Sequence, residues 1–164
     1  MQKSLEEQIT RAKVLLATAR HASMATVNED GSPHNTPFMF MCDEPLEHIY
    51  WGSHPESEHS KNIVRTGQIF VVLYDAFERG GLYMKCIDVH PLGGRELDEA
   101  LAIHNALRAS RNQDELPLSY YTGDSPQRMW SAKIVKLWVN GTTRDENGHV
   151  LQDIRTEITA HDLL

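Results

Sequence analysis

Apolar residues recur at helical spacing in two long parts of the chain. Between residues 5 and 19 they stand three or four positions apart, and Ser4, followed three residues later by a glutamate, has the pattern of a capping box. Residues 95–110 show the same spacing, with acidic side chains near the start that suit the helix dipole. A third, short helix is expected over residues 57–66, because Gly67 stands where a helix C-terminus favours a left-handed residue.

Alternating or β-branched runs predict the strands. Asp30-Gly31 lies in a turn between the first two runs, and residues 145–148 supply the turn of a later hairpin. The expected strands are residues 22–27, 35–42, 47–53, 68–74, 82–89 and 132–139, with the late hairpin leading to residues 150–158. Five closely spaced strands, a late strand and inserted helices indicate a mainly β antiparallel barrel with helical covers, rather than a parallel sheet.

Composition limits the class of protein. A chain of 164 residues with 40% hydrophobic residues is expected to form one domain over residues 1–164. A net charge of -7 argues against a nucleic-acid surface, which needs clustered Lys and Arg. Cys42 and Cys86 lie in apolar runs, which favours buried thiols in a reducing compartment. With neither a signal peptide nor an apolar run long enough to span a membrane, we expect a cytoplasmic protein with no membrane partner.

Several segments, in order and spacing, resemble those of a known family. They are Met24-Ala25-Thr26-Val27-Asn28-Glu29-Asp30-Gly31-Ser32-Pro33-His34-Asn35-Thr36-Pro37, Ile49-Tyr50-Trp51-Gly52-Ser53, Ser60-Lys61-Asn62-Ile63 and Phe70-Val71-Val72-Leu73-Tyr74. Together they resemble the pyridoxamine 5'-phosphate oxidase-like FMN-binding split barrels. The resemblance covers residues 20–88, and residues 126–130 fit it more loosely. It implies a six-stranded antiparallel split β-barrel with flanking helices, and a homodimer that binds FMN between its two subunits.

The chemistry of the expected phosphate site follows from the residue types. Ser57, Ser60 and Lys61 place hydroxyl donors and a cation at the start of the short helix, whose dipole favours an anion. Ser53 can add a hydroxyl from the end of the preceding strand. The resemblance implies that the cofactor is contacted by Asn35, Thr36, Pro37, Phe38, Trp51, Gly52, Ser53, Ser57, Ser60 and Lys61, and in a partner chain by Arg128 and Trp130.

The chain departs from the true pyridoxamine 5'-phosphate oxidases at the residues that hold phosphate. Those enzymes carry an arginine in the second strand and an Arg-Lys pair at the cofactor phosphate, where this chain has His34-Asn35-Thr36 and Ser60-Lys61. Their C-terminal Arg-x-His motif is replaced by Arg155-Thr156-Glu157. Because arginine is the residue best suited to bidentate phosphate recognition, we expect a relative of that enzyme with a different task.

Three functions stay open at this point. The first is an FMN-dependent oxidoreductase, in which the flavin performs the electron transfer and no catalytic side chain is predicted. The second is a non-catalytic module that binds flavin or haem. The third is a reductase that uses the deazaflavin F420. We expect no metal site, since the crowded His54, Glu56, Glu58 and His59 do not have the spacing of a helical zinc motif.

Overall fold

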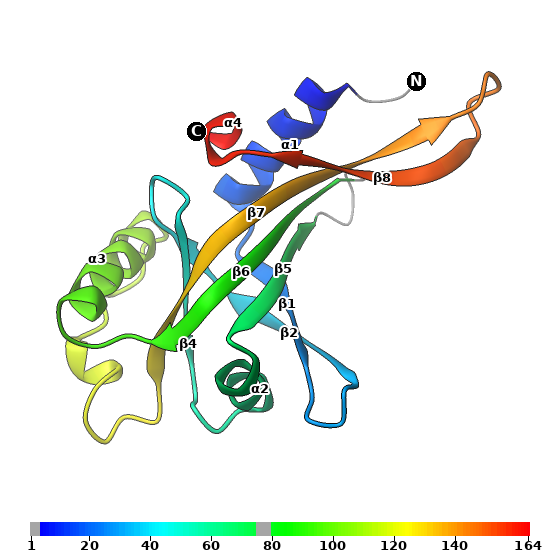
Figure 1. The fold of residues 1–164 in the computed structure, drawn as a ribbon. Helices are drawn as coiled ribbons and strands as arrows, with labels where there is room; N and C mark the ends of the chain where they lie inside the picture. Colours follow the sequence, from blue (N-terminus) through cyan, green and yellow to red (C-terminus); the bar gives the residue numbers. More distant parts are fainter. Residues whose placement is uncertain (1–3, 75–79) are drawn as a thin grey trace.

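One antiparallel sheet, curled into a barrel and flanked by helices, makes up the fold (Figure 1). The computed structural model describes residues 4–74 and 80–164. Within these residues eight strands follow the order β2-β1-β5-β6-β7-β4-β3, with β8 paired to β7. The strands are β1 (His21–Val27), β2 (Pro33–Met39), β3 (Met41–Cys42), β4 (His48–Ser53), β5 (Gln68–Tyr74), β6 (Gly81–Pro91), β7 (Arg128–Arg144) and β8 (Val150–Ile158).

Helices lie at both ends and on one side of the barrel (Figure 1). They are α1 (Leu5–Thr18), α2 (Glu58–Thr66), α3 (Gly94–Ser110) and α4 (Ala160–Leu163), with a 3-10 turn at Leu118–Tyr120. α1 and α4 contact each other near the chain termini, whereas α2 lies at the opposite end and contacts β1, β2 and β6. None of the described helices is long and apolar enough to cross a bilayer.

The two edges of the sheet are consecutive segments of the chain. β2 pairs with β1 along its whole length. After Phe40 the chain continues as β3, which pairs with β4. No ladder joins β2 to β4 among the described strands. The barrel is therefore closed at Phe40 and open between the start of β2 and the end of β4, and we call this opening the split.

Alternation along the strands directs every second side chain into the barrel. In β5, for example, Ile69, Val71 and Leu73 are buried and the residues between them are more exposed. Burying an aliphatic or aromatic side chain of this kind stabilises the folded state by about 1.5–3 kcal/mol. The largest fully buried side chains are those of Trp51, Trp130, Met24, Ile49, Ile63, Leu73, Leu82, Met84, Met129, Val71, Val139 and Cys86.

Side-chain contacts hold α2 against the barrel beside the split. The amide of Asn62 donates to Thr26 Oγ1 at 3.1 Å and to Asn28 Oδ1 at 2.8 Å. Ile63 enters the main core with no exposed surface. The helix stops at Gly67, whose φ of 65° is the left-handed conformation expected there from the sequence. Because both its middle and its end are anchored, the first turn of α2 has a defined place beside the end of β4.

The split-barrel fold is confirmed, but the predicted number of strands is wrong. We expected six strands and the described chain has eight. Residues 35–42 were predicted as one strand, and they divide at Phe40 because the chain changes partner there. The late strand is also longer than predicted, since β7 begins at Arg128 and continues to Arg144 in a hairpin with β8 that projects from the barrel (Figure 1).

The two cysteines are free thiols inside the fold. Cys86 is buried and Cys42 is half-buried. Burial raises the pKa of both thiols, that of Cys86 to about 12. Both therefore stay protonated and unreactive at neutral pH, which agrees with their place in apolar runs.

The anchoring of α2 can be tested with two neighbouring substitutions. Ile63→Ala removes a fully buried side chain, and we expect it to lower the free energy of unfolding by about 2–5 kcal/mol. Val64 is 74% exposed, so Val64→Ala should change stability by no more than about 0.5 kcal/mol. Urea denaturation of both variants measures the difference. Equal stability of the two would contradict the assignment of Ile63 to the core.

Candidate functional site

Three of the predicted serines meet at the split, where β4 ends and α2 begins. Ser53 Oγ lies 3.2 Å from both Ser57 Oγ and Ser60 Oγ, and Ser57 Oγ is 2.8 Å from Ser60 Oγ. Ser57 is the N-cap residue of α2, yet its side chain makes no capping bond. The first-turn amides of the helix therefore receive no side-chain cap, and three hydroxyls stand beside them. This is a set of donors suited to an anion.

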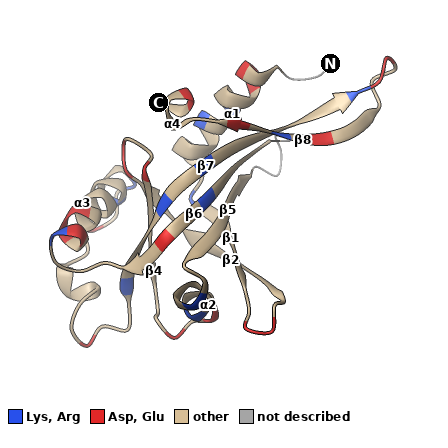
Figure 2. Ribbon diagram, in the orientation of Figure 1, with Lys and Arg blue, Asp and Glu red and all other residues tan. Residues whose placement is uncertain are grey.

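Lys61 adds the positive charge that the sequence predicted. Its Nζ lies 3.5 Å from Glu56 Oε2, and the two side chains are 55% and 75% exposed. An exposed pair at this distance contributes little to stability and is easily exchanged for another partner. Figure 2 shows Lys and Arg residues on α2 and at the start of β7, at the same end of the barrel. The cation is thus available to a ligand at the start of α2.

A histidine that we did not assign to the cofactor site belongs to the same cluster. His59 Nε2 lies 2.6 Å from Ser53 Oγ and 3.1 Å from Ser57 Oγ. Burial lowers the pKa of His59, and the charge of His34 on β2 lowers it further. His59 is therefore neutral at neutral pH. From the sequence, His59 is considered only as a metal ligand, because no motif shows that it lies beside Ser53.

The predicted aromatic contacts form part of the barrel interior. The rings of Trp51 and Trp130 stack at 6.4 Å with 12° between their planes, and Phe38 meets Trp51 edge-on at 5.8 Å. Trp130 Nε1 donates to the carbonyl of Ser53 at 3.4 Å. Trp51 has no exposed surface, and its buried indole N–H has no hydrogen-bond partner among the described residues. These rings support the end of β4 from behind the split.

The predicted β2 residues divide between the two faces of the strand. Asn35 and Pro37 are exposed, whereas Thr36 is half-buried and Phe38 is buried on the opposite face. Asn35 Oδ1 accepts a bond of 2.6 Å from the hydroxyl of Ser23 on β1. Only Thr36 and Phe38 therefore share a face, and Asn35 and Pro37 point the other way.

Lys61, Arg128 and Trp130 line a common cavity of about 640 Å³. The remaining walls come from the segment before α2 and from residues 91–93 after β6. Arg128 is held in place by its own chain, because its guanidinium donates to the carbonyls of Ser125 at 2.6 Å, Gln127 at 2.7 Å and Gly123 at 3.1 Å. The structure thus brings Arg128 and Lys61 to the same cavity within one chain.

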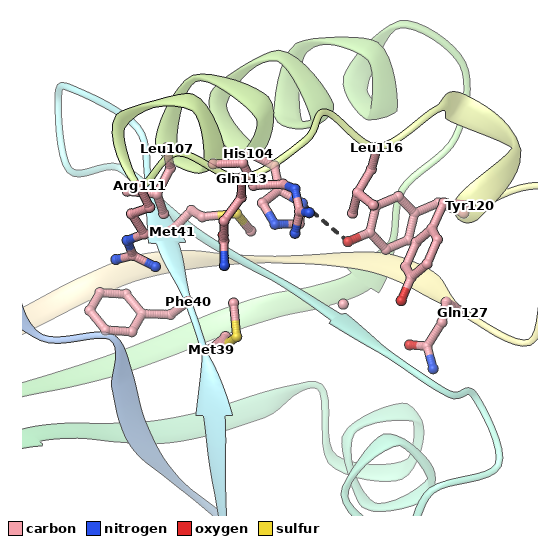
Figure 3. Close-up of a pocket in the computed structure, with 13 residues that line it drawn as sticks. Met39, Phe40, Met41, His104, Leu107, Arg111, Gln113, Leu116, Tyr120 and Gln127 are labelled. Carbon is pink, nitrogen blue, oxygen red and sulfur yellow. Dashed lines mark hydrogen bonds between the residues drawn. The ribbon is translucent and has the colours of Figure 1, made fainter.

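A second cavity, of about 230 Å³, lies beneath α3 (Figure 3). Met39, Phe40, Met41, Leu107 and Leu116 form an apolar wall, and Arg108, Arg111, Gln113 and Gln127 supply polar groups. Gly52 of β4 also lines it, which connects this cavity to the strand that carries Ser53. The sequence does not predict this cavity, because part of its lining comes from residues 112–125, which carry no periodic pattern.

Tyr121 and His104 form a neutral pair in the wall of the second cavity. Tyr121 Oη and His104 Nδ1 are 3.2 Å apart, as the dashed line in Figure 3 marks. Burial, with a smaller contribution from Tyr120, raises the pKa of Tyr121 to about 12. Burial, followed by the charges of Arg108 and Arg111, lowers the pKa of His104. Both groups are uncharged at neutral pH and leave the arginines as the positive groups of the cavity.

The metal ligands considered from the sequence do not form a cluster. Within the described residues, no group of three or more His, Cys, Asp or Glu side chains is placed to hold a metal ion. His54 Nδ1 instead accepts a bond of 3.0 Å from the backbone of Glu56, and His59 bonds to serines.

Comparisons with known proteins identify the fold. No family model and no curated protein sequence matches the chain. A Clostridium acetobutylicum protein related to general stress protein 26, of the pyridoxinephosphate oxidase family, superposes with a TM-score of 0.63, covering 93% of this chain and 96% of that one at 14% identity. A heme binding protein from Mycobacterium smegmatis superposes with a TM-score of 0.63 at 15% identity, covering 98% of this chain and 60% of that one. An F420 reductase superposes with a TM-score of 0.55 at 15% identity, covering 76% of this chain and 94% of that one.

Substitution of Gly52 tests the contact between β4 and the wall of the second cavity. A Cβ at this position would lie 3.0 Å from Cε1 and 3.1 Å from Oη of Tyr121. Gly52→Ala should therefore displace the Tyr121 ring and cost about 1–3 kcal/mol of stability in urea denaturation. Gly93→Ala is the control, because a Cβ there meets nothing within 4 Å. A Gly52→Ala protein as stable as the control would mean that the ring moves away freely.

Proposed function

From the fold of the pyridoxamine 5'-phosphate oxidase-like split barrels, which this chain has, we propose that it binds FMN at the split and acts as an FMN-dependent oxidoreductase. The observation that carries the proposal is the group of three hydroxyls, from Ser53, Ser57 and Ser60, at the uncapped start of α2. A hydroxyl cluster at a helix N-terminus beside an exposed lysine matches the needs of a phosphate dianion.

The fit to a phosphate follows from the hydrogen bonds. The serine hydroxyls bond to one another and to His59, so their protons can turn to phosphate oxygens without breaking any secondary structure. The first-turn amides of α2 point in the direction in which the helix dipole favours negative charge. Lys61 needs only to leave the exposed carboxylate of Glu56 to complete the site.

The flavin ring system fits the free edge of β2. None of the described strands pairs with the side of β2 that faces the split, so the backbone N–H and C=O groups on this side are open to the polar edge of a ring. Thr36 adds a hydroxyl on the inner face, and Phe38 with Trp51 forms an apolar support beneath it. Pro37 contributes only its carbonyl, because proline has no N–H.

We further propose a homodimer with the cofactor between two subunits, as the resemblance implies. Arg128 and Trp130 were expected to reach the partner's cofactor. Trp130 is 2% exposed in its own chain and Arg128 is tied to residues 123–127. In the dimer, Arg128 is therefore the better candidate to contact a ligand, with Trp130 holding the strand behind it.

Bound FMN supplies electron transfer between its isoalloxazine and a substrate. This chain's residues would position the cofactor and exclude water, and no side chain is assigned a catalytic step. The cavity beneath α3 adjoins Gly52 and is the proposed place of the substrate. Its apolar wall and two arginines favour an apolar body with an anionic group.

FMN titration tests the phosphate site. Loss of the charge-assisted contact in Lys61→Ala should weaken FMN binding by about 10-fold or more, measured by quenching of flavin fluorescence. Lys13→Ala is the matched control, since Lys13 is exposed on α1 at the other end of the barrel. Unchanged affinity of Lys61→Ala for FMN would show that the phosphate does not bind at Lys61.

The identity of the cofactor is checked separately. The absorbance spectrum of the purified protein distinguishes flavin from haem and from F420. Reduction by NADH or NADPH, followed by reoxidation by an acceptor, distinguishes a turning-over oxidoreductase from a binding module. Failure of FMN to bind or to raise the melting temperature would exclude the proposed function.

A further inference from the structure

Where the true pyridoxamine 5'-phosphate oxidases carry an arginine in the second strand and an Arg-Lys pair at the cofactor phosphate, this chain has His34-Asn35-Thr36 and Ser60-Lys61, and His59 directly precedes the second segment. His59 comes from the first turn of α2, and His34 lies on β2 on the same face as Thr36. Lys61 is the one Lys or Arg in the first turn of α2, and Glu56 partly neutralises it. Arg128 lines the same cavity, but its guanidinium already donates to carbonyls of residues 123–127, so a phosphate dianion at this place would gain from a further cationic donor.

His59 is already bonded to the hydroxyls that would hold the phosphate. Its Nε2 is 2.6 Å from Ser53 Oγ and 3.1 Å from Ser57 Oγ. A phosphate oxygen that accepts from these hydroxyls would also lie beside Nε2. A neutral imidazole in this position can donate at most one hydrogen bond to the phosphate. A protonated imidazole donates the same hydrogen bond, and its positive charge strengthens it.

Resting on the proposed FMN site, we propose that His59, aided by His34 on β2, a strand that α2 contacts, is a ligand of the cofactor phosphate, and that the site takes up a proton when FMN binds. The histidines thereby perform in a pH-dependent way the task that arginines perform at all pH values. This proposal concerns how the site recognises the 5'-phosphate and regulates its affinity.

The groups around His59 are consistent with a proton taken up at this residue. α2 contacts β1, β2 and β6, and β4 ends at Ser53 beside it. β1 carries His21, β2 carries His34, and β4 carries His48 and Tyr50. The other titratable and charged groups of these elements and of the neighbouring start of β7 are Tyr83, Lys85, Cys86, Asp88 and His90 on β6, Arg128 on β7, and Glu56, Glu58, Lys61 and Arg65 on or next to α2. Of these, only His34 affects the pKa of His59 by its charge.

The direction of the pH dependence follows from the two states. Without ligand, burial and His34 hold the pKa of His59 below its ordinary value of 6.5, so the imidazole is neutral at neutral pH. A dianion in contact with the ring favours the charged form and raises this pKa. Affinity for FMN therefore rises as pH falls from about 8 to about 6.5. The rise is at most about 10-fold for each pH unit, because one proton is taken up. Below about pH 6 the phosphate itself becomes protonated and the gain ends.

Calorimetry of FMN binding measures the proton directly. Titrations at about pH 7.5, in two buffers with different heats of ionisation, give the number of protons exchanged. We expect uptake of a substantial fraction of one proton by the unaltered protein and close to none by His59→Gln. His149→Gln, at the distant turn of the β7–β8 hairpin, is the control and should behave like the unaltered protein.

Two further measurements separate ligand contact from a structural role. His59→Arg carries its charge at all pH values, so it should keep FMN affinity and lose both proton uptake and pH dependence. Riboflavin, which lacks the phosphate, should bind without proton uptake. If FMN binds to the unaltered protein with no proton uptake, or if His59→Gln retains the uptake, the histidine proposal is overturned while the FMN function stands. If FMN does not bind at all, the proposed FMN function and the histidine proposal are both overturned.

Discussion

The structure depends on one change of partner along the chain. β2 is paired with β1 until Met39, and after Phe40 the chain pairs with β4 instead. This change closes the barrel where β3 pairs with β4. It leaves β2 and the end of β4 without a ladder between them. Unpaired backbone groups at an inner edge need other partners, since leaving them buried and unbonded costs about 1–3 kcal/mol each. The proposed cofactor would supply such partners at this opening.

α2 brings hydrogen-bond donors to this opening. Asn62 and Ile63 fasten the helix to the barrel, and its first turn then lies beside Ser53 at the end of β4. Tertiary packing, rather than the local sequence, sets the angle at which the amides and hydroxyls meet. The stacked Trp51 and Trp130 hold the end of β4 at the same level from inside the barrel. A rigid strand end and a rigid helix start together make a preorganised site, which lowers the cost of binding.

The sequence predicted most of the elements, but it assigned the site only in part. Alternation identified the β strands, and the left-handed position at Gly67 identified the end of α2. The serines were identified because they lie close together in sequence. Thr36 and Asn35 were assigned to one site, although a strand with a period of two places them on opposite faces. Trp51 was assigned to the cofactor, whereas its complete burial places the ring in the core.

The sequence by itself determined the fold class, because hydrophobic periodicity and turn residues act over short distances and can be read locally. It also brought together the residue types of the proposed phosphate site, since Ser57, Ser60 and Lys61 lie within one turn of each other. Only the tertiary structure decided that His59 bonds to Ser53 on a helix that contacts β2, that Arg128 shares a cavity with Lys61, and that Gly52 borders a cavity beneath α3. These contacts join residues that are far apart in sequence, and their proximity results from barrel closure and helix packing, which no local pattern encodes.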